Sequence, residues 1–201
     1  IDISDVQLPP YYPQTALAKR DWANGLEAMQ IVDRQVGAVL SRLEDEGLAD
    51  NTVIFIIGDN GRCMPRGKQF LYDGGIQVPI IVKWPGKIEA GLTNDDLVTT
   101  IDISKTILDI AGVETAYELH GKNLLDGSTN ARKYIFASRG KMDSTHDAMR
   151  AVRTKKFKLI HNLMPERAYC QYNNYKERSY PVLAQLNVCL LYTSDAADDL
   201  L

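Results

Sequence analysis

The spacing of apolar residues predicts a long helix followed by a buried strand in the first third of the chain. Between Thr15 and Glu46 apolar side chains recur every three or four positions, as in an amphipathic helix, and Gly47 is placed to end it. Asp33 falls inside this stripe, so we expect its carboxylate to have a hydrogen-bonding or ionic partner, in a structural role or near a functional site. The apolar run 52–57 predicts a strand buried on both faces.

Two further elements complete the pattern of an α/β fold. Residues 78–82 have the composition of a second strand, and residues 97–111 that of a helix that Gly112 ends. Asp102 is the expected N-cap of this helix. The succession of helix, strand, loop, strand and helix is typical of an α/β sandwich, so the predicted fold class is α/β.

The pattern changes after residue 127, where short strands replace long helices. Three strands are expected, the last two joined as a hairpin through residues 154–156; they span residues 134–138, 149–153 and 157–161. We therefore predict two domains. Residues 1–127 would be the C-terminal part of an α/β domain, and residues 128–188 a smaller antiparallel α+β subdomain.

The remaining segments are irregular in composition. Residues 162–181 are rich in Tyr, Asn, Arg and Pro, which predicts a long surface loop or a substrate-facing lid. Residues 189–201 break the preceding pattern, and we expect them to be a non-native tail. We also expect the natural protein to have further residues before Ile1 and to continue past residue 188 with a different sequence.

Composition limits the partners of the chain. The formal net charge is −3, so there is no electrostatic case for a nucleic-acid partner or for an anionic membrane surface. No apolar run approaches the roughly 18 residues of a membrane span, so we expect no membrane insertion. The three cysteines have no metal-ligand spacing.

Candidate chemistry lies just beyond the buried strand, where ligands gather in open α/β sheets. Asp59 and Asn60 are hard oxygen donors, suited to Ca²⁺ or Mg²⁺, although a strand-end Asp-Asn-Gly is also a common turn. Because Ca²⁺ takes roughly 6–8 oxygen ligands, others must come from elsewhere. Lys68 is a compact cation suited to sulfate or phosphate, and Arg62 and Arg66 could add forked contacts; the alternative is a solvated basic loop.

The ordered motifs of this region resemble the C-terminal part of the catalytic domain of type I sulfatases, in the alkaline-phosphatase-like superfamily. Between residues 51 and 86 an apolar strand is followed by Asp-Asn-Gly, Gly-Lys, Tyr-Asp-Gly-Gly, Val-Pro and Trp-Pro-Gly. Further matching stretches are residues 30–37, 102–112 and 121–127, and the resemblance covers roughly residues 6–187. Residues 138–167 are also similar to the C-terminal part of heparan N-sulfatases (sulfamidases) and their bacterial relatives.

The resemblance implies roles for individual residues. Asp59 and Asn60 match the second pair of Ca²⁺ ligands, with Mg²⁺ as the alternative ion, and Lys68 matches the catalytic lysine that holds the sulfate oxygens, where sulfamidases often have Arg. His146 and Arg150 are candidates for substrate contacts or are merely solvated. The implied substrate is a sulfated carbohydrate, as in glycosaminoglycan degradation, and the implied location is periplasmic or secreted.

The nucleophile of the family is a formylglycine made from Cys or Ser in the motif Cys/Ser-x-Pro-x-Arg. In the stretch from Cys63 to Arg66 the arginine comes one residue too early, so we expect the true motif upstream of Ile1. The full-length protein would then be a sulfuric ester or sulfamate hydrolase, and this stretch alone would not turn over substrate. Two alternatives stay open: a phosphodiesterase or phosphonate hydrolase of the same superfamily, and a non-catalytic module that binds sulfated glycans.

Overall fold

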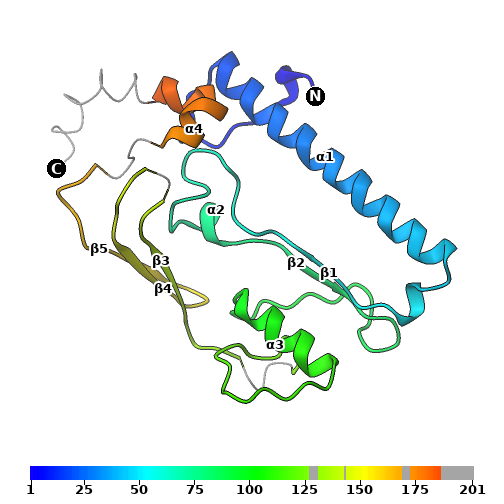
Figure 1. Cartoon of the computed structure of the whole chain (residues 1–201). Helices are drawn as coiled ribbons and strands as arrows, with labels where there is room; N and C mark the ends of the chain where they lie inside the picture. The colour runs from blue at the N-terminus through cyan, green and yellow to red at the C-terminus, as the bar shows by residue number, and fades with distance from the viewer. Residues whose placement is uncertain (127–130, 143, 169–172, 187–201) are drawn as a thin grey trace. The chain divides into compact units, whose positions relative to one another are not determined.

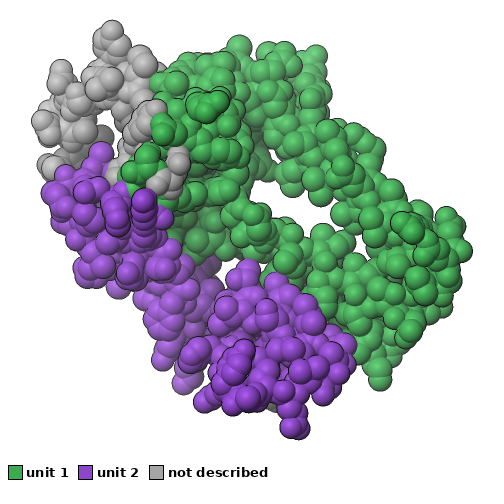
Figure 2. Space-filling model, in the orientation of Figure 1, with its two compact units in different colours: residues 1–90, 142–145, 170–201 green, residues 91–141, 146–169 purple. Residues whose placement is uncertain are grey.

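A computed structural model describes residues 1–126, 131–142, 144–168 and 173–186 (Figure 1). The chain divides into two compact units (Figure 2): unit 1 comprises residues 1–90, 142–145 and 170–201, and unit 2 comprises residues 91–141 and 146–169. The predicted domain boundary at residue 127 and the predicted tail 189–201 lie outside the described residues, and that division stays a prediction. No helix in the described ranges is both long enough and apolar enough to cross a membrane.

Unit 1 begins with a short 3₁₀ turn, η1 (Ile3–Asp5), and the long helix α1 (Ala16–Asp45). The Thr15 side chain caps α1 by accepting a hydrogen bond from the Ala18 N–H at 3.2 Å, and Gly47 follows the helix with a φ of 69°. The predicted helix and both of its ends are therefore confirmed. Its N-terminal part is packed, because Ala18 joins Tyr12, Met64 and Val182 in a buried apolar cluster.

The rest of α1 is exposed to solvent in the described chain. The expectation that the Asp33 carboxylate has a hydrogen-bonding or ionic partner is therefore wrong. Met29, Val32 and Val39 are each more than half exposed, at 58%, 55% and 61%. Asp33 is exposed as well, so water solvates its carboxylate and no protein partner is needed. Apolar spacing identifies the helix, but burial depends on the elements that cover it.

The first sheet of unit 1 pairs two strands, β1 (Ile54–Ile57) and β2 (Ile80–Lys83). The strands are antiparallel, with Ile54 opposite Lys83 and Ile57 opposite Ile80. The prediction that the strand at 52–57 is buried on both faces is wrong, because Ile57 is 48% exposed and the other residues of β1 are only half-buried. Two strands have an open face unless another layer covers them. The 3₁₀ turn η2 (Ala49–Asn51) leads into β1, and helix α2 (Asp73–Ile76) lies in the connection between the strands.

Unit 1 also contains helix α4 (Asn174–Ser179), which changes the picture of the predicted loop 162–181. Asn173 caps α4 by accepting a hydrogen bond from the Lys176 N–H at 2.8 Å. Residues 181–186 are also helical, and the Val182 N–H donates to the Asp21 carboxylate of α1 at 2.8 Å. The segment 173–181 is therefore an ordered part of unit 1 rather than an irregular loop.

Unit 2 contains helix α3 (Ile101–Ile110), and Gly112 follows it with a φ of 65°. The N-cap is Thr100, so the assignment of Asp102 as the cap is wrong. Asp102 lies in the first turn of α3 and is fully buried. Its carboxylate accepts two hydrogen bonds of 2.6 Å from the Arg132 guanidinium. It also accepts from the backbone N–H of Lys122 at 2.7 Å, so it holds the segment after α3 in place.

The antiparallel sheet of unit 2 has the order β3 (Ile135–Arg139), β4 (Met149–Arg153), β5 (Lys158–Asn162). The predicted hairpin is confirmed, since the Thr154 N–H donates to the Phe157 carbonyl at 2.7 Å across the turn between β4 and β5. The sheet is two-faced. Met149 and Ala151 are buried, and on the other face Phe136 is 73% exposed.

Candidate functional site

The candidate site is the loop of residues 58–79 that joins β1 to β2. Backbone hydrogen bonds wind this loop back on itself: the Gly58 N–H donates to the Pro79 carbonyl at 3.1 Å and the Gly61 N–H to the Gly75 carbonyl at 3.1 Å. The Lys68 N–H donates to the Arg62 carbonyl at 2.7 Å. These hydrogen bonds make the loop compact and fix the Cα positions from which its polar side chains extend.

Three glycines are required by this winding, and one of them is Gly75, where a Cβ would lie 2.1 Å from the Phe70 carbonyl oxygen. A Cβ on Gly61 would lie 2.1 Å from the Gly74 carbonyl oxygen, and one on Gly67 would lie 1.9 Å from the Arg62 carbonyl oxygen. All three clashes are with backbone, which cannot swing aside as a flexible side chain could. The glycine spacing seen in the sequence thus serves close approach of one backbone segment to another.

Asp59 and Asn60 follow β1 directly, as the sequence predicts. Asp59 is exposed and Asn60 is half-buried, and the Cys63 thiol lies 3.9 Å from the Asn60 side-chain oxygen. The pair offers one carboxylate and one amide oxygen, which is the donor type of Ca²⁺ and Mg²⁺. Among the residues that the structure describes, no group of three or more His, Cys, Asp or Glu side chains is placed to hold a metal. The two donors therefore fit such an ion as part of a larger ligand set.

Lys68 lies in a strained part of the loop. Its ammonium is 5.5 Å from the ring centroid of Tyr175 on α4, a cation–π contact, and the Tyr175 side chain is 48% exposed. Arg66 and Gln69 on either side have φ values of 59° and 90°, the left-handed region that non-glycine residues rarely adopt. Backbone strain of this kind gathers at functional sites, where the surrounding structure holds it in place.

The two loop arginines contact aromatic rings. The Arg62 guanidinium lies 4.2 Å from the centroid of the Trp22 ring on α1. The Arg66 guanidinium lies 4.9 Å from the ring centroid of Tyr11 and 5.4 Å from that of Tyr72. These cation–π contacts hold the loop against the N-terminal segment and against α1. The predicted substrate contacts of Arg62 and Arg66 stay predictions.

The buried Tyr12 and the half-buried Tyr180 lie beside the stretch from Cys63 to Arg66. The Tyr12 hydroxyl donates to the Pro65 carbonyl at 2.9 Å, and Tyr12 is 4% exposed. Burial raises the pKa of Tyr180, and its hydrogen bond with Tyr175 and the neighbouring Cys63 thiol add to the effect. The half-buried Cys63 thus has a hydroxyl and an amide as neighbours, and its surroundings fit a packed side chain better than a modification site.

His146 and Arg150 belong to unit 2. Both are exposed. The His146 carbonyl accepts a hydrogen bond from Arg167 at 2.7 Å, and the Arg150 guanidinium donates to the carbonyls of Arg139 at 3.3 Å and Met149 at 2.8 Å. Asp147 between them is buried in an ion pair with Arg139, with Nε and Oδ2 3.0 Å apart. Their roles in substrate binding stay predictions.

Sequence reasoning missed several side chains from outside the loop that contact it: Tyr11, Tyr12, Trp22, Met29, Tyr175 and Lys176. The only signal was the tyrosine-rich composition of the segment predicted as a lid. Trp22 follows the apolar spacing of the predicted helix, and its contact with Arg62, 40 residues away (62 − 22), leaves no pattern in the neighbouring sequence.

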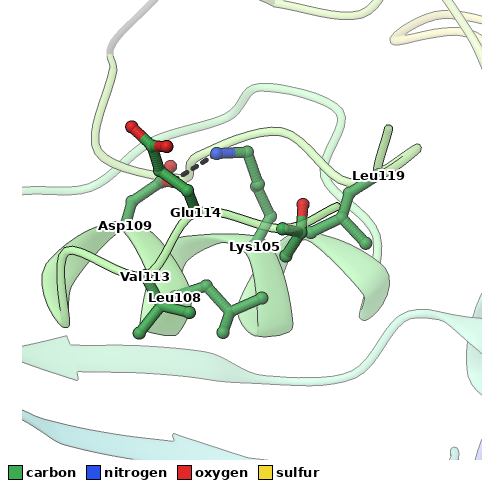
Figure 3. Close-up of a pocket in the computed structure, with 7 residues that line it drawn as sticks. Lys105, Leu108, Asp109, Val113, Glu114 and Leu119 are labelled. Atoms are coloured by element: carbon green, nitrogen blue, oxygen red, sulfur yellow. Dashed lines mark hydrogen bonds and ion pairs between the residues drawn. The ribbon is translucent and has the colours of Figure 1, made fainter. Parts of the chain in front are cut away.

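Unit 2 has a hollow of about 330 Å³ beside α3 (Figure 3). Two of the three charged residues that line it are paired: the Lys105 ammonium forms an ion pair with the Asp109 carboxylate, to which the Asn123 amide also donates at 3.0 Å, and Glu114 is the third. The hydrogen bond from Lys105 lowers the pKa of Asp109. Charges that satisfy each other favour a structural role for this hollow.

Two protein-family models match the chain. The sulfatase model matches residues 7–113, and the model of the C-terminal region of N-sulphoglucosamine sulphohydrolase matches residues 66–179. The chain belongs to the sulfatase family. The resemblance inferred from the motifs around Asp59 and Lys68 is confirmed.

Curated relatives agree with this assignment. The chain is 40% identical over 180 residues to an ulvan-active sulfatase of Formosa agariphila, covering 89% of this chain and 30% of that protein. It is 31% identical over 176 residues to human N-sulphoglucosamine sulphohydrolase, covering 81% of this chain and 35% of that protein. The sulfatase chain described here thus spans about a third of the length of these relatives.

A solved structure supports the predicted fold class. The structure of BT4656 in complex with its substrate D-glucosamine-2-N,6-O-disulfate superposes with a TM-score of 0.58 at 26% identity, over 76% of this chain and 33% of that one. The prediction of the C-terminal part of an α/β sandwich with a smaller antiparallel sheet is confirmed.

Proposed function

We propose that this chain forms the metal-binding and sulfate-binding part of a hydrolase that acts on sulfate esters or sulfamates of carbohydrates. The observation that carries the proposal is the wound loop in a sulfatase-family chain, with Asp59 and Asn60 at one end and Lys68 held in the strained turn. Anion-binding hydrolases need such fixed charges, because preorganised groups stabilise developing charge without rearranging during the reaction.

Asp59 and Asn60 would supply two oxygen ligands to Ca²⁺, or alternatively Mg²⁺, and the remaining ligands would come from other parts of the full-length protein. A divalent ion at this place neutralises the negative charge of a bound sulfate and acidifies an attacking hydroxyl group. The exposure of Asp59 supports this assignment, since its carboxylate is open to an ion.

Lys68 would bind the sulfate oxygens and stabilise the charge that builds on them as the S–O or S–N bond breaks. Lys68 is half-buried, and a charge on a half-buried residue is screened by water less than one at the open surface. Arg62, Arg66, His146 and Arg150 are proposed to contact the sugar or its sulfates.

The formylglycine nucleophile would come from the part of the full-length protein that precedes this chain. Cys63 does not fit that role, because Arg66 follows it one residue too early and the thiol faces Asn60 and Tyr180. We therefore assign no step of the reaction to Cys63.

The proposed substrate is a sulfated amino sugar of the glucosamine type, and the proposed location is periplasmic or secreted. The match of residues 66–179 to the N-sulphoglucosamine sulphohydrolase model supports this class of sugar. A second relative, the N-acetylglucosamine-6-O-sulfatase of Bacteroides thetaiotaomicron, is 32% identical over 68% of this chain, so both N- and O-sulfates are to be tested.

The test is Lys68→Ala in the full-length protein, with the exposed Lys87→Ala as a matched control. We expect Lys68→Ala to lower kcat/KM on N-sulfated or 6-O-sulfated glucosamine by about 100-fold or more, at an unchanged melting temperature. A wild-type enzyme that prefers a phosphate diester would support the phosphodiesterase alternative. Glycan binding without turnover would support the non-catalytic one.

A further inference from the structure

Lys176 on α4 is a buried lysine whose ammonium contacts the backbone of the candidate site at Lys68. Its side chain is 2% exposed, and its Nζ donates a hydrogen bond to the backbone carbonyl of Lys68. The same ammonium lies 5.0 Å from the ring centroid of Phe70. A buried ammonium is costly unless it is well paired, so a carbonyl and an aromatic face at this position indicate a specific arrangement.

Helix α4 is capped at its start and is attached to α1 just beyond its end. Asn173, which is 1% exposed, caps its first turn, and Val182 beyond it donates to the buried Asp21 of α1 at 2.8 Å. These contacts fix the backbone from which the Lys176 side chain extends. Lys176 can therefore act as a rigid support for the loop.

The carbonyl that Lys176 holds belongs to the peptide group between Lys68 and Gln69. The orientation of that peptide plane is set by ψ of Lys68 and φ of Gln69, and φ of Gln69 is 90°. Rotating the peptide by half a turn would bring this φ to a relaxed negative value, so the present orientation carries backbone strain at Gln69. The hydrogen bond from Lys176 opposes that flip, because flipping would leave the buried ammonium without this acceptor.

We propose that Lys176 is a positioning residue: by donating to the Lys68 carbonyl it keeps the loop backbone at Lys68 against α4, where Tyr175 contacts the Lys68 ammonium, and so places that ammonium for the bound sulfate group. Tyr175, next to it on α4, contacts the other end of Lys68 through its ring, 5.5 Å from the ammonium. Helix α4 thus holds both the backbone and the side chain of the anion-binding lysine. This inference rests on the proposed function and adds the residue that orients its key cation.

The test measures competitive inhibition by inorganic sulfate in the full-length enzyme. Lys176→Met keeps the length of the side chain and removes its charge and donors, and Lys176→Arg keeps both charge and donors. We expect Lys176→Met to raise Ki for sulfate by about 10-fold, and Lys176→Arg to restore much of the lost affinity. Arg178→Met, an exposed change on the same helix, is the matched control and leaves Ki unchanged.

A double mutant separates positioning from general support. In the Lys68→Ala background, Lys176→Met should leave Ki for sulfate unaltered, because the cation that it positions is gone. An unchanged Ki in the single variant, or an equal rise in both backgrounds, would overturn the inference. If Lys176→Met does not fold, Lys176→Gln is used in the same cycle. A wild-type protein that neither binds sulfate nor hydrolyses sulfated sugars would refute the proposed function itself.

Discussion

The guanidinium of Arg62 lies 4.2 Å from the centroid of the Trp22 ring, and this contact joins the candidate loop to helix α1. A second contact, 3.8 Å from the same guanidinium to the Met29 sulfur, lies about two turns further along α1. Arg62 is therefore engaged with the scaffold, and a role in binding substrate would have to compete with that contact.

The contact between Arg62 and Trp22 should be measurable in a double-mutant cycle. We expect Arg62→Met and Trp22→Leu to show a coupling of roughly 0.5–1 kcal/mol in urea unfolding of the full-length protein, as is usual for an exposed cation–π pair. Arg20→Met on the exposed part of α1 is the control and should show no coupling to Trp22→Leu. Strict additivity for Arg62 would argue against the contact. A rise in KM in the Arg62 variant that persists in the Trp22→Leu background would support a substrate contact.

Alanine should have opposite effects on stability at two glycines, one in the wound loop and one in the middle of α1. Gly61→Ala should lower the free energy of unfolding by about 3 kcal/mol, because its Cβ would lie 2.1 Å from the Gly74 carbonyl oxygen. Gly37→Ala should raise it by about 0.5–1 kcal/mol, since Gly37 is in the middle of α1 with nothing within 4 Å of an added Cβ. Thermal unfolding of both variants checks this. Equal effects would mean that the loop is looser than described.

The proposed metal ligand Asp59 can be tested without measuring turnover. Isothermal titration of the full-length protein with Ca²⁺ should show at least about a 10-fold loss of affinity in Asp59→Asn, because a ligand charge is removed. Asp50→Asn, an exposed change in the turn before β1, should bind Ca²⁺ like the wild type. Ca²⁺ should also raise the melting temperature of the wild type and of Asp50→Asn more than that of Asp59→Asn. Equal affinities in all three would remove Asp59 from the metal site.

Tyr12 should make the protein sensitive to alkali. Burial raises the pKa of its hydroxyl above the ordinary value of 10.0. Below about pH 10 both states keep the proton, and as pH rises further the unfolded chain ionises before the folded one, so stability falls. Tyr12→Phe should reduce this slope above pH 10 while lowering stability at pH 7 by about 1 kcal/mol, since the bond to the Pro65 carbonyl is lost. Urea unfolding at pH 7 and above pH 10 measures both, with the exposed Tyr117→Phe as control; an unchanged alkaline slope in Tyr12→Phe would contradict the prediction.

Local signals determined much of the fold. Helix α1 has its predicted ends because Thr15 and Gly47 act on the backbone next to them, and β4 spans the predicted residues 149–153. Asp102 shows where such signals fail. An Asp near the start of a helix resembles a cap, but this one is bonded to Arg132, 30 residues away. A side chain whose partner is distant in the sequence leaves no local pattern.

The sequence by itself determined the sulfatase-like order of residues in the loop, because Asp59, Asn60, Lys68 and the glycines lie in one continuous segment. Only the tertiary structure decided what surrounds that segment. The Lys68 carbonyl is held by a lysine 108 positions later, and Arg62 rests on a tryptophan 40 positions earlier (62 − 22). Burial was also decided there, since an apolar strand such as Ile54–Ile57 is buried only as far as other layers cover it. Such contacts join residues that are far apart in the sequence, so they depend on the tertiary fold and cannot be read from the residues on either side.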